Sequence, residues 1–450
     1  MTEKLFGTDG VRGVANTELT PEMALALGVA AAKVLGTSHR PRFVIGRDTR
    51  VSGIMLEAAL SAGLCSMGAE VVSLGVASTP AVACTTRSEG FDAGAVISAS
   101  HNPFADNGIK FFGGDGFKLD DSIEAEIEAI VLNHKDVARA SGMGVGSISL
   151  IPELADHYVA HIEEAMDGTR LEGVSVILDG SNGANYRLGP RVLRDLGAEV
   201  ECIHCDPNGG NINAQCGSLY PGEMQRLTVS RNANIGLAFD GDADRVILSD
   251  EHGRLVDGDR VMMLVGKHLA RQGKLRHNTV VGTVMSNMGL EVALRKDNVT
   301  LLRSQVGDRY VSEMMRKDGY SLGGEKSGHL IFGDITTTGD GLLTALEVLR
   351  VVKETGRPLS DLADEMTEYP QVLLGVRVRD RNTWAADKEI QEAIRKSEQV
   401  LAGRGRINVR ASGTEKLIRI MAEGPDQEEI DAIASEIASI VERKMGAAKV

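Results

Sequence analysis

Two kinds of apolar pattern alternate along this chain. Short apolar runs rich in branched residues are typical of strands buried on both faces, and they occur at 42–46, 94–97, 176–178, 235–239 and 245–248. Longer segments predict helices at 21–35, 53–67, 187–196, 258–271, 340–354 and 427–444. Thr20-Pro21-Glu22 marks a helix start, with Pro21 at the first helical position. Alternating strands and helices predict an α/β protein with layered, largely parallel sheets.

One order of elements repeats. A strand, a loop and a helix are followed by a glycine turn and a second strand, where the sequence is Gly-Ala-Glu-Val at 68–71. The same order of elements occurs again later in the chain, with the same four residues at 197–200. This repeat indicates two related α/β units about 130 residues apart. We place domain boundaries in the flexible segment 141–147, near Gly253 and at Tyr369-Pro370, which gives domains of 1–146, 147–254, 255–368 and 369–450.

Composition narrows the class of protein. The chain has 450 residues, 42% of them hydrophobic and 25% charged, and a formal net charge of −14. This charge argues against binding nucleic acid or a membrane surface, and any anion site must be built locally. No apolar run is long enough for a membrane span, and no signal-peptide core precedes the first helix, so we expect a cytoplasmic protein.

The chain contains five cysteines scattered along its length, which favours a reducing compartment over a disulfide framework. Cys202-Ile-His-Cys205 has a spacing that could hold zinc, but only Cys216 follows it, whereas a four-coordinate site needs a second pair. Small buried residues are therefore the preferred interpretation of these cysteines.

A polar loop at 98–110 follows the buried strand 94–97. It places Ser100, His101 and Lys110 at the carboxyl end of a strand, where open α/β sheets bind ligands. A serine hydrolase is disfavoured, because neighbouring residues of an extended chain point to opposite faces and no Gly-x-Ser-x-Gly elbow is present.

Carboxylates occupy alternate positions in Asp240-Gly-Asp-Ala-Asp-Arg245, directly after another buried strand. Such oxygen ligands can converge on one hard cation, and three carboxylates with few other ligands suit Mg²⁺. An EF-hand is excluded because Arg245 stands where that motif requires glycine. A solvated acidic turn is the plainer alternative.

Three further loops carry glycines and polar groups that could contact a ligand. Leu5-Phe-Gly-Thr-Asp-Gly-Val-Arg-Gly13 is a glycine-rich turn that can approach a ligand closely. Gly323-Gly-Glu-Lys-Ser-Gly-His329 exposes groups that can hydrogen-bond hydroxyls, and its spacing is not that of a P-loop. Arg410-Ala-Ser-Gly-Thr-Glu415, with Arg419 nearby, combines guanidinium groups with a glycine-exposed backbone, which suits a phosphate dianion. Each loop taken alone is also compatible with an ordinary polar turn.

Together, in this order, the serine, acidic, sugar-type and phosphate-type loops resemble the four signature loops of the α-D-phosphohexomutase superfamily, over the whole chain. Within it, Phe-Gly-Thr-Asp-Gly-Val-Arg-Gly and Asp-Asn-Gly-Ile-Lys-Phe-Phe112 look like the bacterial members that act on glucosamine phosphates. The resemblance implies three similar α/β domains with mixed, mostly parallel sheets between helices, and a smaller α+β C-terminal domain, around a central cleft.

The resemblance also implies roles for particular residues. Ser100 would carry a phosphoryl group and, with Asp240, Asp242 and Asp244, hold one Mg²⁺. The residues around the transferring group would be Arg12, His101, Lys110, Arg245 and His329. Those that bind the substrate would be Glu325, Ser327, Arg410, Ser412, Gly413, Thr414 and Arg419. Lys110 is the candidate acid or base, with a pKa lowered by burial or by cations such as Arg12.

The implied reaction interconverts glucosamine 6-phosphate and glucosamine 1-phosphate, a precursor of aminosugar nucleotides, through a phosphoserine and a sugar bisphosphate that also serves as activator. The implied partner is the phosphosugar alone, and a homodimer is compatible with the sequence. Lys326, Ala411, Lys416 and Tyr220 depart from the usual motifs. A glucose or mannose phosphate mutase, and a non-catalytic phosphosugar-binding regulator, remain the alternatives.

Overall fold

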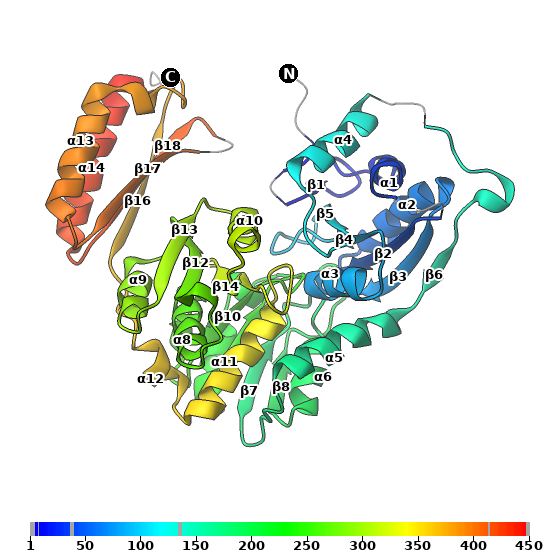
Figure 1. Cartoon of the computed structure of the whole chain (residues 1–450), viewed down its shortest axis with the longest axis horizontal. Helices are drawn as coiled ribbons and strands as arrows, with labels where there is room; N and C mark the ends of the chain where they lie inside the picture. The colour runs from blue at the N-terminus through cyan, green and yellow to red at the C-terminus, as the bar shows by residue number, and fades with distance from the viewer. Residues whose placement is uncertain (1–4, 8, 37–39, 134–136, 413–414, 447–450) are drawn as a thin grey trace.

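The computed structural model describes residues 5–7, 9–36, 40–133, 137–412 and 415–446. Four sheets follow one another along this part of the chain, and helices lie against each of them (Figure 1). Sheet order therefore follows sequence order, as the repeated pattern of strand and helix predicts. None of the helices in these residues is long and apolar enough to cross a membrane.

The first sheet has six strands in the order β1-β5-β4-β2-β3-β6. These are β1 (Val11–Val14), β2 (Arg42–Arg47), β3 (Glu70–Val76), β4 (Ala93–Ile97), β5 (Asp106–Gly113) and β6 (Ile148–Leu150). The pairs among β2, β3, β4 and β6 are parallel, and β5 runs antiparallel to both β4 and β1. Strand β6 pairs with β3, so the first sheet extends past residue 146, where the sequence places the first boundary. Without β6, the edge of β3 would be unpaired.

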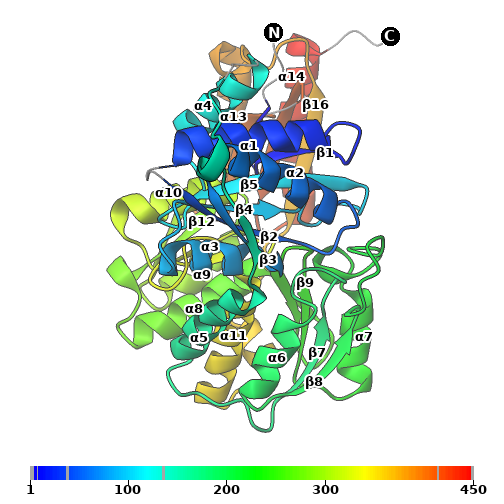
Figure 2. The ribbon, with the colours of Figure 1, turned by 90° about the vertical axis from the view of Figure 1, so that its right-hand side faces the viewer.

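Helices cover the two faces of this sheet (Figure 2). They are α1 (Pro21–Leu35), α2 (Gly53–Ser66), α3 (Thr79–Ser88) and α4 (Asp121–Leu132). The N-terminus of α1 is capped by Thr20, whose side chain accepts a hydrogen bond from the Met23 amide. A Cβ added to Gly28 of α1 would lie 2.3 Å from the Leu60 carbonyl oxygen, so glycine allows α1 and α2 to approach closely.

The second and third sheets repeat the parallel arrangement and end in antiparallel strands. The second has the order β11-β10-β9-β7-β8 and the third has β13-β12-β14-β15. Their strands are β7 (Ser175–Asp179), β8 (Glu199–Ile203), β9 (Ile235–Phe239), β10 (Val246–Ser249), β11 (Leu255–Val256), β12 (Thr279–Thr283), β13 (Thr300–Ser304), β14 (Leu322–Gly324) and β15 (Leu330–Phe332).

The helices of these two domains are α5 (Ala155–Ala165), α6 (Leu188–Asp195), α7 (Gly222–Ser230), α8 (Gly258–Arg271), α9 (Met288–Arg295), α10 (Asp308–Asp318), α11 (Gly341–Thr355) and α12 (Leu359–Ala363). One continuous apolar core joins the two domains, from Tyr158 of α5 to Met366. Helix α11 is buried at every position from Gly341 to Val351, so it lies in the middle of this core. The two middle domains therefore form one rigid base.

The C-terminal domain is a smaller α+β unit. Its antiparallel sheet has the order β16-β18-β17, with β16 (Gln371–Arg377), β17 (Arg406–Ala411) and β18 (Leu417–Glu423), and α13 (Lys388–Leu401) and α14 (Gln427–Met445) cover one face. Arg406 attaches it to the third domain by donating to the Val284 carbonyl at 2.9 Å, while buried Glu423 accepts from the Met288 amide at 2.8 Å. The expected fold of three α/β domains and a smaller α+β domain is confirmed.

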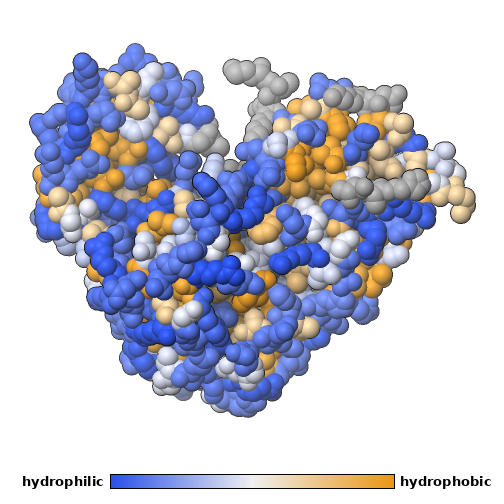
Figure 3. All heavy atoms as spheres, in the orientation of Figure 1, coloured by the Kyte–Doolittle hydropathy of each residue, from blue (hydrophilic) through white to orange (hydrophobic). Residues whose placement is uncertain are grey.

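The four domains surround a hollow. Figure 3 shows a deep notch between the C-terminal domain and the first domain, with the middle domains at its base. The hairpin of β17 and β18 extends from the C-terminal domain toward the first domain (Figure 1). This notch is the central cleft that the family resemblance implies.

Candidate active site

Ser100 lies in a tight loop between β4 and β5, so the loop joins two antiparallel strands. Ser100 has a φ of +51° and is fully buried. Its amide donates to Oγ of Ser98 at 2.9 Å, and Ser98 in turn donates to Asp48 at 2.6 Å. This left-handed turn fixes the direction of the Ser100 hydroxyl, and a nonglycine residue held there is a feature of functional sites.

The same turn brings His101 to the serine, which corrects one part of the sequence reasoning. Nδ1 of His101 lies 3.3 Å from Oγ of Ser100, although neighbours in extended chain would point to opposite faces. Nδ1 also lies 3.1 Å from Nη1 of Arg245, and burial, Arg245 and Arg12 lower the pKa of His101. A neutral imidazole therefore lies between the serine hydroxyl and a guanidinium group.

The acidic loop 240–244 joins β9 to β10 and meets the serine loop directly. Ser100 Oγ donates to Oδ2 of Asp240 at 2.6 Å. A Cβ added to Gly241 would lie 2.5 Å from the Ser100 carbonyl oxygen, so only glycine allows this approach. The two loops, about 140 positions apart in sequence, therefore form one site.

The three carboxylates are arranged to bind a cation. Asp240, Asp242 and Asp244 are each at least 99% buried and present oxygens within 4.8 Å of one another. Oδ1 of Asp242 and Oδ1 of Asp244 are buried without a hydrogen-bond partner. Burial, reinforced by the neighbouring carboxylates, raises the pKa of Asp240 well above its usual value. Buried, mutually repelling oxygens with free lone pairs fit a hard divalent cation.

Lys110 lies within β5, opposite Val96 of β4, instead of on the loop. Its Nζ is 2.7 Å from Oδ2 of Asp242 and 3.6 Å from Oδ2 of Asp244. Although burial alone would lower the pKa of Lys110, the charges of Asp242, Asp9 and Asp244 raise it. The expected lowering of this pKa is therefore wrong for the chain in this state: Lys110 is a buried ammonium paired with the carboxylates.

Around this centre lies a chain of alternating charges that sequence reasoning missed. Lys118 donates to Asp9 at 2.6 Å and also pairs with Asp308, and Asp9 pairs with Arg12. His329 is 99% buried between Asp244, at 3.6 Å, and Asp308, at 3.7 Å. Burial opposes the charged form of His329, but Asp244 and Asp308 raise its pKa. Arg12 and His329, which the sequence predicts, thus lie in one network with Arg245 and Lys110.

Arg50 is a second missed residue, and it holds the serine loop. Its guanidinium is fully buried and donates to the carbonyl oxygens of Ser100 at 2.9 Å, Asn102 at 2.9 Å, Pro103 and Asp106 at 3.0 Å. Nε pairs with Asp48 at 2.8 Å. The sequence signal available was only an Asp-x-Arg turn, Asp48-Thr49-Arg50, directly after a strand.

The sugar-type loop joins β14 to β15 and lies beside the acidic loop. Glu325 is partly buried and accepts from the Gly307 amide at 3.0 Å, while Ser327 is exposed. A Cβ added to Gly328 would lie 2.1 Å from the Val246 carbonyl oxygen, so this loop packs against the start of β10. Lys326 donates to Glu368 at 2.8 Å, so its charge is already paired.

The phosphate-type loop lies at the end of the β17–β18 hairpin. Arg410 and Arg419 are directly opposite each other in the ladder, and burial and the Arg419 charge lower the pKa of Arg410. Like charges directly opposite on a sheet repel, so this pair is suited to an anion that neutralises both. Ser412 is buried, and its carbonyl accepts from Arg381 at 2.7 Å. Gly413 and Thr414 lie outside the described residues.

Comparison with known proteins agrees with this arrangement. The phosphoglucomutase/phosphomannomutase models for the alpha/beta/alpha domains I, II and III match residues 3–138, 156–253 and 257–369, and the model for the C-terminal domain matches 373–440. The chain belongs to the phosphoglucomutase/phosphomannomutase family, within the α-D-phosphohexomutase superfamily.

Several relatives in this family are similar over their whole length. Phosphoglucosamine mutase from Clostridium novyi is 51% identical over 99% of this chain and 100% of its own. The enzyme of that name from Desulforamulus reducens is 52% identical over 97% of this chain and 99% of its own.

Solved structures show the same fold at lower identity. A phosphoglucomutase/phosphomannomutase family protein from Burkholderia thailandensis superimposes with a TM-score of 0.82 at 23% identity, covering 98% of both chains. Aspergillus fumigatus N-acetylphosphoglucosamine mutase, solved with GlcNAc-6P and magnesium, has a TM-score of 0.68 at 19% identity and covers 98% of this chain and 95% of its own.

Proposed function

We propose that this chain is an isomerase that interconverts glucosamine 6-phosphate and glucosamine 1-phosphate, through a phosphoserine at Ser100 and a sugar bisphosphate. The observation that carries the proposal is the 2.6 Å contact between Oγ of Ser100 and Asp240, inside a buried set of three carboxylates. The phosphoglucosamine mutases at about 50% identity over nearly the whole chain support the choice of an amino sugar. The product feeds the synthesis of UDP-N-acetylglucosamine.

One Mg²⁺ per chain would be held by Asp240, Asp242 and Asp244 together with an oxygen of phosphorylated Ser100. When bound, this cation neutralises negative charge on the phosphoryl oxygens. The two carboxylate oxygens without hydrogen-bond partners support this ligand set. Activity should disappear on exhaustive chelation and return with Mg²⁺; full activity in the chelated enzyme would contradict the proposal.

The chain's own residues position the phosphoryl group. Arg12, Lys110 and Arg245 supply positive charge around the Ser100 oxygen, and neutral His101 lies between Ser100 and Arg245. Phosphoryl transfer requires in-line positioning and charge neutralisation more than covalent chemistry, which this arrangement provides. We propose Lys110 as the group that holds or moves the proton of the reacting sugar hydroxyl.

Beside the acidic loop, Glu325 and Ser327 would bind the ring hydroxyls. Arg410, Ser412 and Arg419, with Gly413 and Thr414, would bind the phosphate that is not reacting. A bisphosphate carries a phosphate at each end, so this clamp can hold the intermediate in either orientation. A sugar 1,6-bisphosphate would also restore phosphoserine to unphosphorylated enzyme and so act as activator. Assembly into a homodimer remains a prediction from the sequence.

Two measurements test the function. The enzyme should have its highest kcat/KM with glucosamine 6-phosphate; higher values with glucose or mannose phosphates would favour a hexose phosphate mutase instead. Replacing Ser100 with alanine should leave the fold intact and remove nearly all activity, because the covalent step needs its hydroxyl. A matched variant of the neighbouring serine, Ser98→Ala, should remain a substrate for phosphorylation at Ser100. Phosphate found on Ser98, with Ser100→Ala still active, would contradict the assignment.

A further inference from the structure

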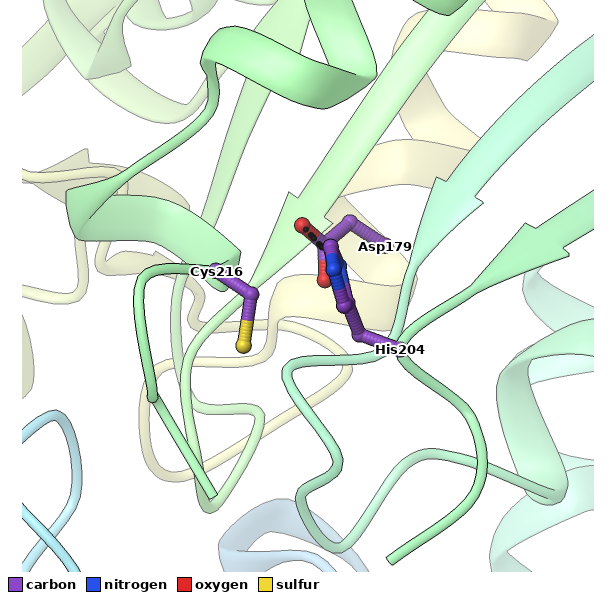
Figure 4. Close-up of side chains that lie close together, drawn as sticks. All are labelled: Asp179, His204 and Cys216. Atoms are coloured by element: carbon purple, nitrogen blue, oxygen red, sulfur yellow. Dashed lines mark ion pairs between the residues drawn. The ribbon is translucent and has the colours of Figure 1, made fainter. Parts of the chain in front are cut away.

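A second cluster of ligand-type side chains lies in the second domain, apart from the acidic triplet. Asp179 is the last residue of β7, His204 directly follows β8, and Cys216 lies in the loop that leads to α7. One ligand atom of each lies within 4.8 Å of the other two, and all three side chains point toward a common space (Figure 4). Residues about 37 positions apart thus meet at the carboxyl edge of the second sheet.

Asp179 is held in place before any ligand binds. It is fully buried, and its Oδ1 accepts from the Ser181 amide at 2.8 Å while Oδ2 accepts from the Gly217 amide at 2.9 Å. Each carboxylate oxygen keeps a further lone pair. Backbone hydrogen bonds of this kind orient a carboxylate ligand.

His204 presents one ring nitrogen to the cluster and the other to an acid. Its Nδ1 lies 3.0 Å from Oδ2 of Asp179 but is buried without an aligned hydrogen-bond partner. Its Nε2 lies 3.4 Å from Oε2 of Glu223. A histidine that binds a metal usually donates its second ring N–H to a carboxylate, and Glu223 is placed to accept it.

The arrangement does not suit a nucleophilic cysteine. In such a triad the histidine would use one nitrogen for the acid and the other for the thiol, whereas here Nε2 faces Glu223. Cys216 is 99% buried, and burial, reinforced by Asp179, raises the pKa of its thiol to about 12. A thiol of this kind is unreactive unless a cation displaces its proton.

We propose that Asp179, His204 and Cys216 form a binding site for a borderline-soft divalent cation of the Zn²⁺ class, distinct from the acidic triplet. One thiolate, one imidazole and one carboxylate are the donor types that Zn²⁺ takes, and with two negative charges they neutralise it. Tetrahedral coordination separates such donors by about 3.4–3.6 Å, which small side-chain movements from the present positions would reach.

Occupation of this site would stabilise the loop that supports Ser100. Asn213, three residues before Cys216, donates to the Ser100 carbonyl at 2.8 Å and to the Asn102 carbonyl at 3.0 Å. Its neighbour Ile212 is buried. A cation on Cys216 would cross-link this segment to the ends of β7 and β8. It would therefore restrain the Ser100 loop through the two hydrogen bonds of Asn213.

The test uses the full chain with the acidic triplet saturated by excess Mg²⁺, and Co²⁺ as a spectroscopic probe. Wild type should bind one equivalent of Co²⁺ with a thiolate-to-cobalt charge-transfer band in the near ultraviolet, which carboxylates alone do not produce. Cys216→Ser should lose the band, and His204→Gln should weaken binding by about 10–100-fold. Cys205→Ser, which changes a neighbouring thiol outside the cluster, should keep both.

Zn²⁺ should also raise the melting temperature of wild type and Cys205→Ser through preferential binding to the folded state, and should raise that of His204→Gln much less at the same Zn²⁺ concentration. Because His204 is at the partly exposed edge, its variant remains informative if Cys216→Ser folds poorly. Absence of the band in wild type would overturn the proposal. So would a band that persists in Cys216→Ser or vanishes in Cys205→Ser, since the thiolate would then come from the Cys202–Cys205 pair.

Discussion

Replacing Arg50 with methionine should destabilise the first domain and disable Ser100 together. Methionine keeps the apolar part of the side chain but removes five hydrogen bonds, one to Asp48 and four to carbonyl oxygens of the serine loop. It also leaves Asp48 buried without its cation. The loop would then be held by the contact of Ser98 with the Ser100 amide, by the contact of Ser100 with Asp240, and by the contacts that Asn213 makes to it from the second domain.

The magnitude follows from which of these effects dominates. A sum of four charge-assisted hydrogen bonds at about 1.5–3 kcal/mol each would overestimate the loss, since it exceeds what single substitutions usually cost. The real loss is smaller because the freed carbonyl oxygens can accept hydrogen bonds from water or from Asn213. Breaking one buried ion pair by removing a partner costs about 3–5 kcal/mol, and we take that as the prediction. At about 2–4 °C per kcal/mol, the melting temperature of the domain should fall by roughly 6–20 °C.

Two controls separate this cause from general damage. Arg47→Met removes a neighbouring arginine that pairs with Glu57 at 2.8 Å, where the two side chains are 18% and 14% exposed, and it should cost less than Arg50→Met because solvent can reach the carboxylate left behind. In the double variant Asp48→Asn/Arg50→Met, the buried charge is gone and part of the loss should be recovered. Differential scanning calorimetry and the phosphate content of Ser100 are the readouts.

The pH dependence gives a further check with a definite sign. Burial already raises the pKa of Asp48 in the presence of Arg50, and removing Arg50 must raise it further. A raised carboxyl pKa means that the folded state binds a proton more readily than the unfolded state, so the penalty in Arg50→Met should shrink as pH falls. The reasoning fails if Arg50→Met melts like Arg47→Met, or if its deficit is the same at all pH values.

Three other predictions concern separate parts of the chain. Lys110→Met should lower kcat by about 10²–10⁴-fold with little change in KM, and a preserved kcat would exclude Lys110 from both proton transfer and charge stabilisation. Arg419→Ala should lower kcat/KM by more than about tenfold and release more bisphosphate per turnover, whereas Arg377→Ala on the same sheet should do neither. Asp259→Asn should gain stability relative to wild type as pH rises from 5 to 8, by about 2–3 kcal/mol, because burial and then Asp257 raise the pKa of Asp259 to about 7 and its ionisation opposes folding. Chemical denaturation at several pH values measures this difference, and a constant difference would contradict the assignment.

Local patterns were sufficient to predict most elements and the four loops of the site. The helix predicted at 21–35 coincides with α1, since Thr20 and Pro21 specify its start and the chain ends it at Gly36. The strand predicted at 235–239 coincides with β9, because all five residues are buried and apolar. Such signals depend on neighbours in sequence, so they can be read without the fold.

Long-range electrostatics could not be predicted in this way. The pKa of Lys110 depends on Asp9 and Asp242, which approach it from other loops. The prediction from sequence considered only burial and cations such as Arg12. The contact between Ser100 and His101 depends on a positive φ at Ser100, which no residue type there requires. Arg50 was missed because one buried guanidinium in a loop resembles any surface arginine until its carbonyl partners are known.

The raised pKa of Lys110 and the unpaired carboxylate oxygens have one explanation. Without a cation, the acidic triplet needs a counter-ion, and Lys110 provides it through Asp242 and Asp244. A divalent cation on the same carboxylates would offset the attraction of Asp242 and Asp244 for the Lys110 charge and leave that of Asp9, so the pKa of Lys110 should fall on metal binding. The acidic triplet would then do more than hold a cation: its occupancy would decide whether Lys110 can give up a proton. If Lys110 has the proposed role, proton transfer by Lys110 and cation binding by Asp242 would therefore be coupled, and a site with only one of the two would be electrostatically incomplete.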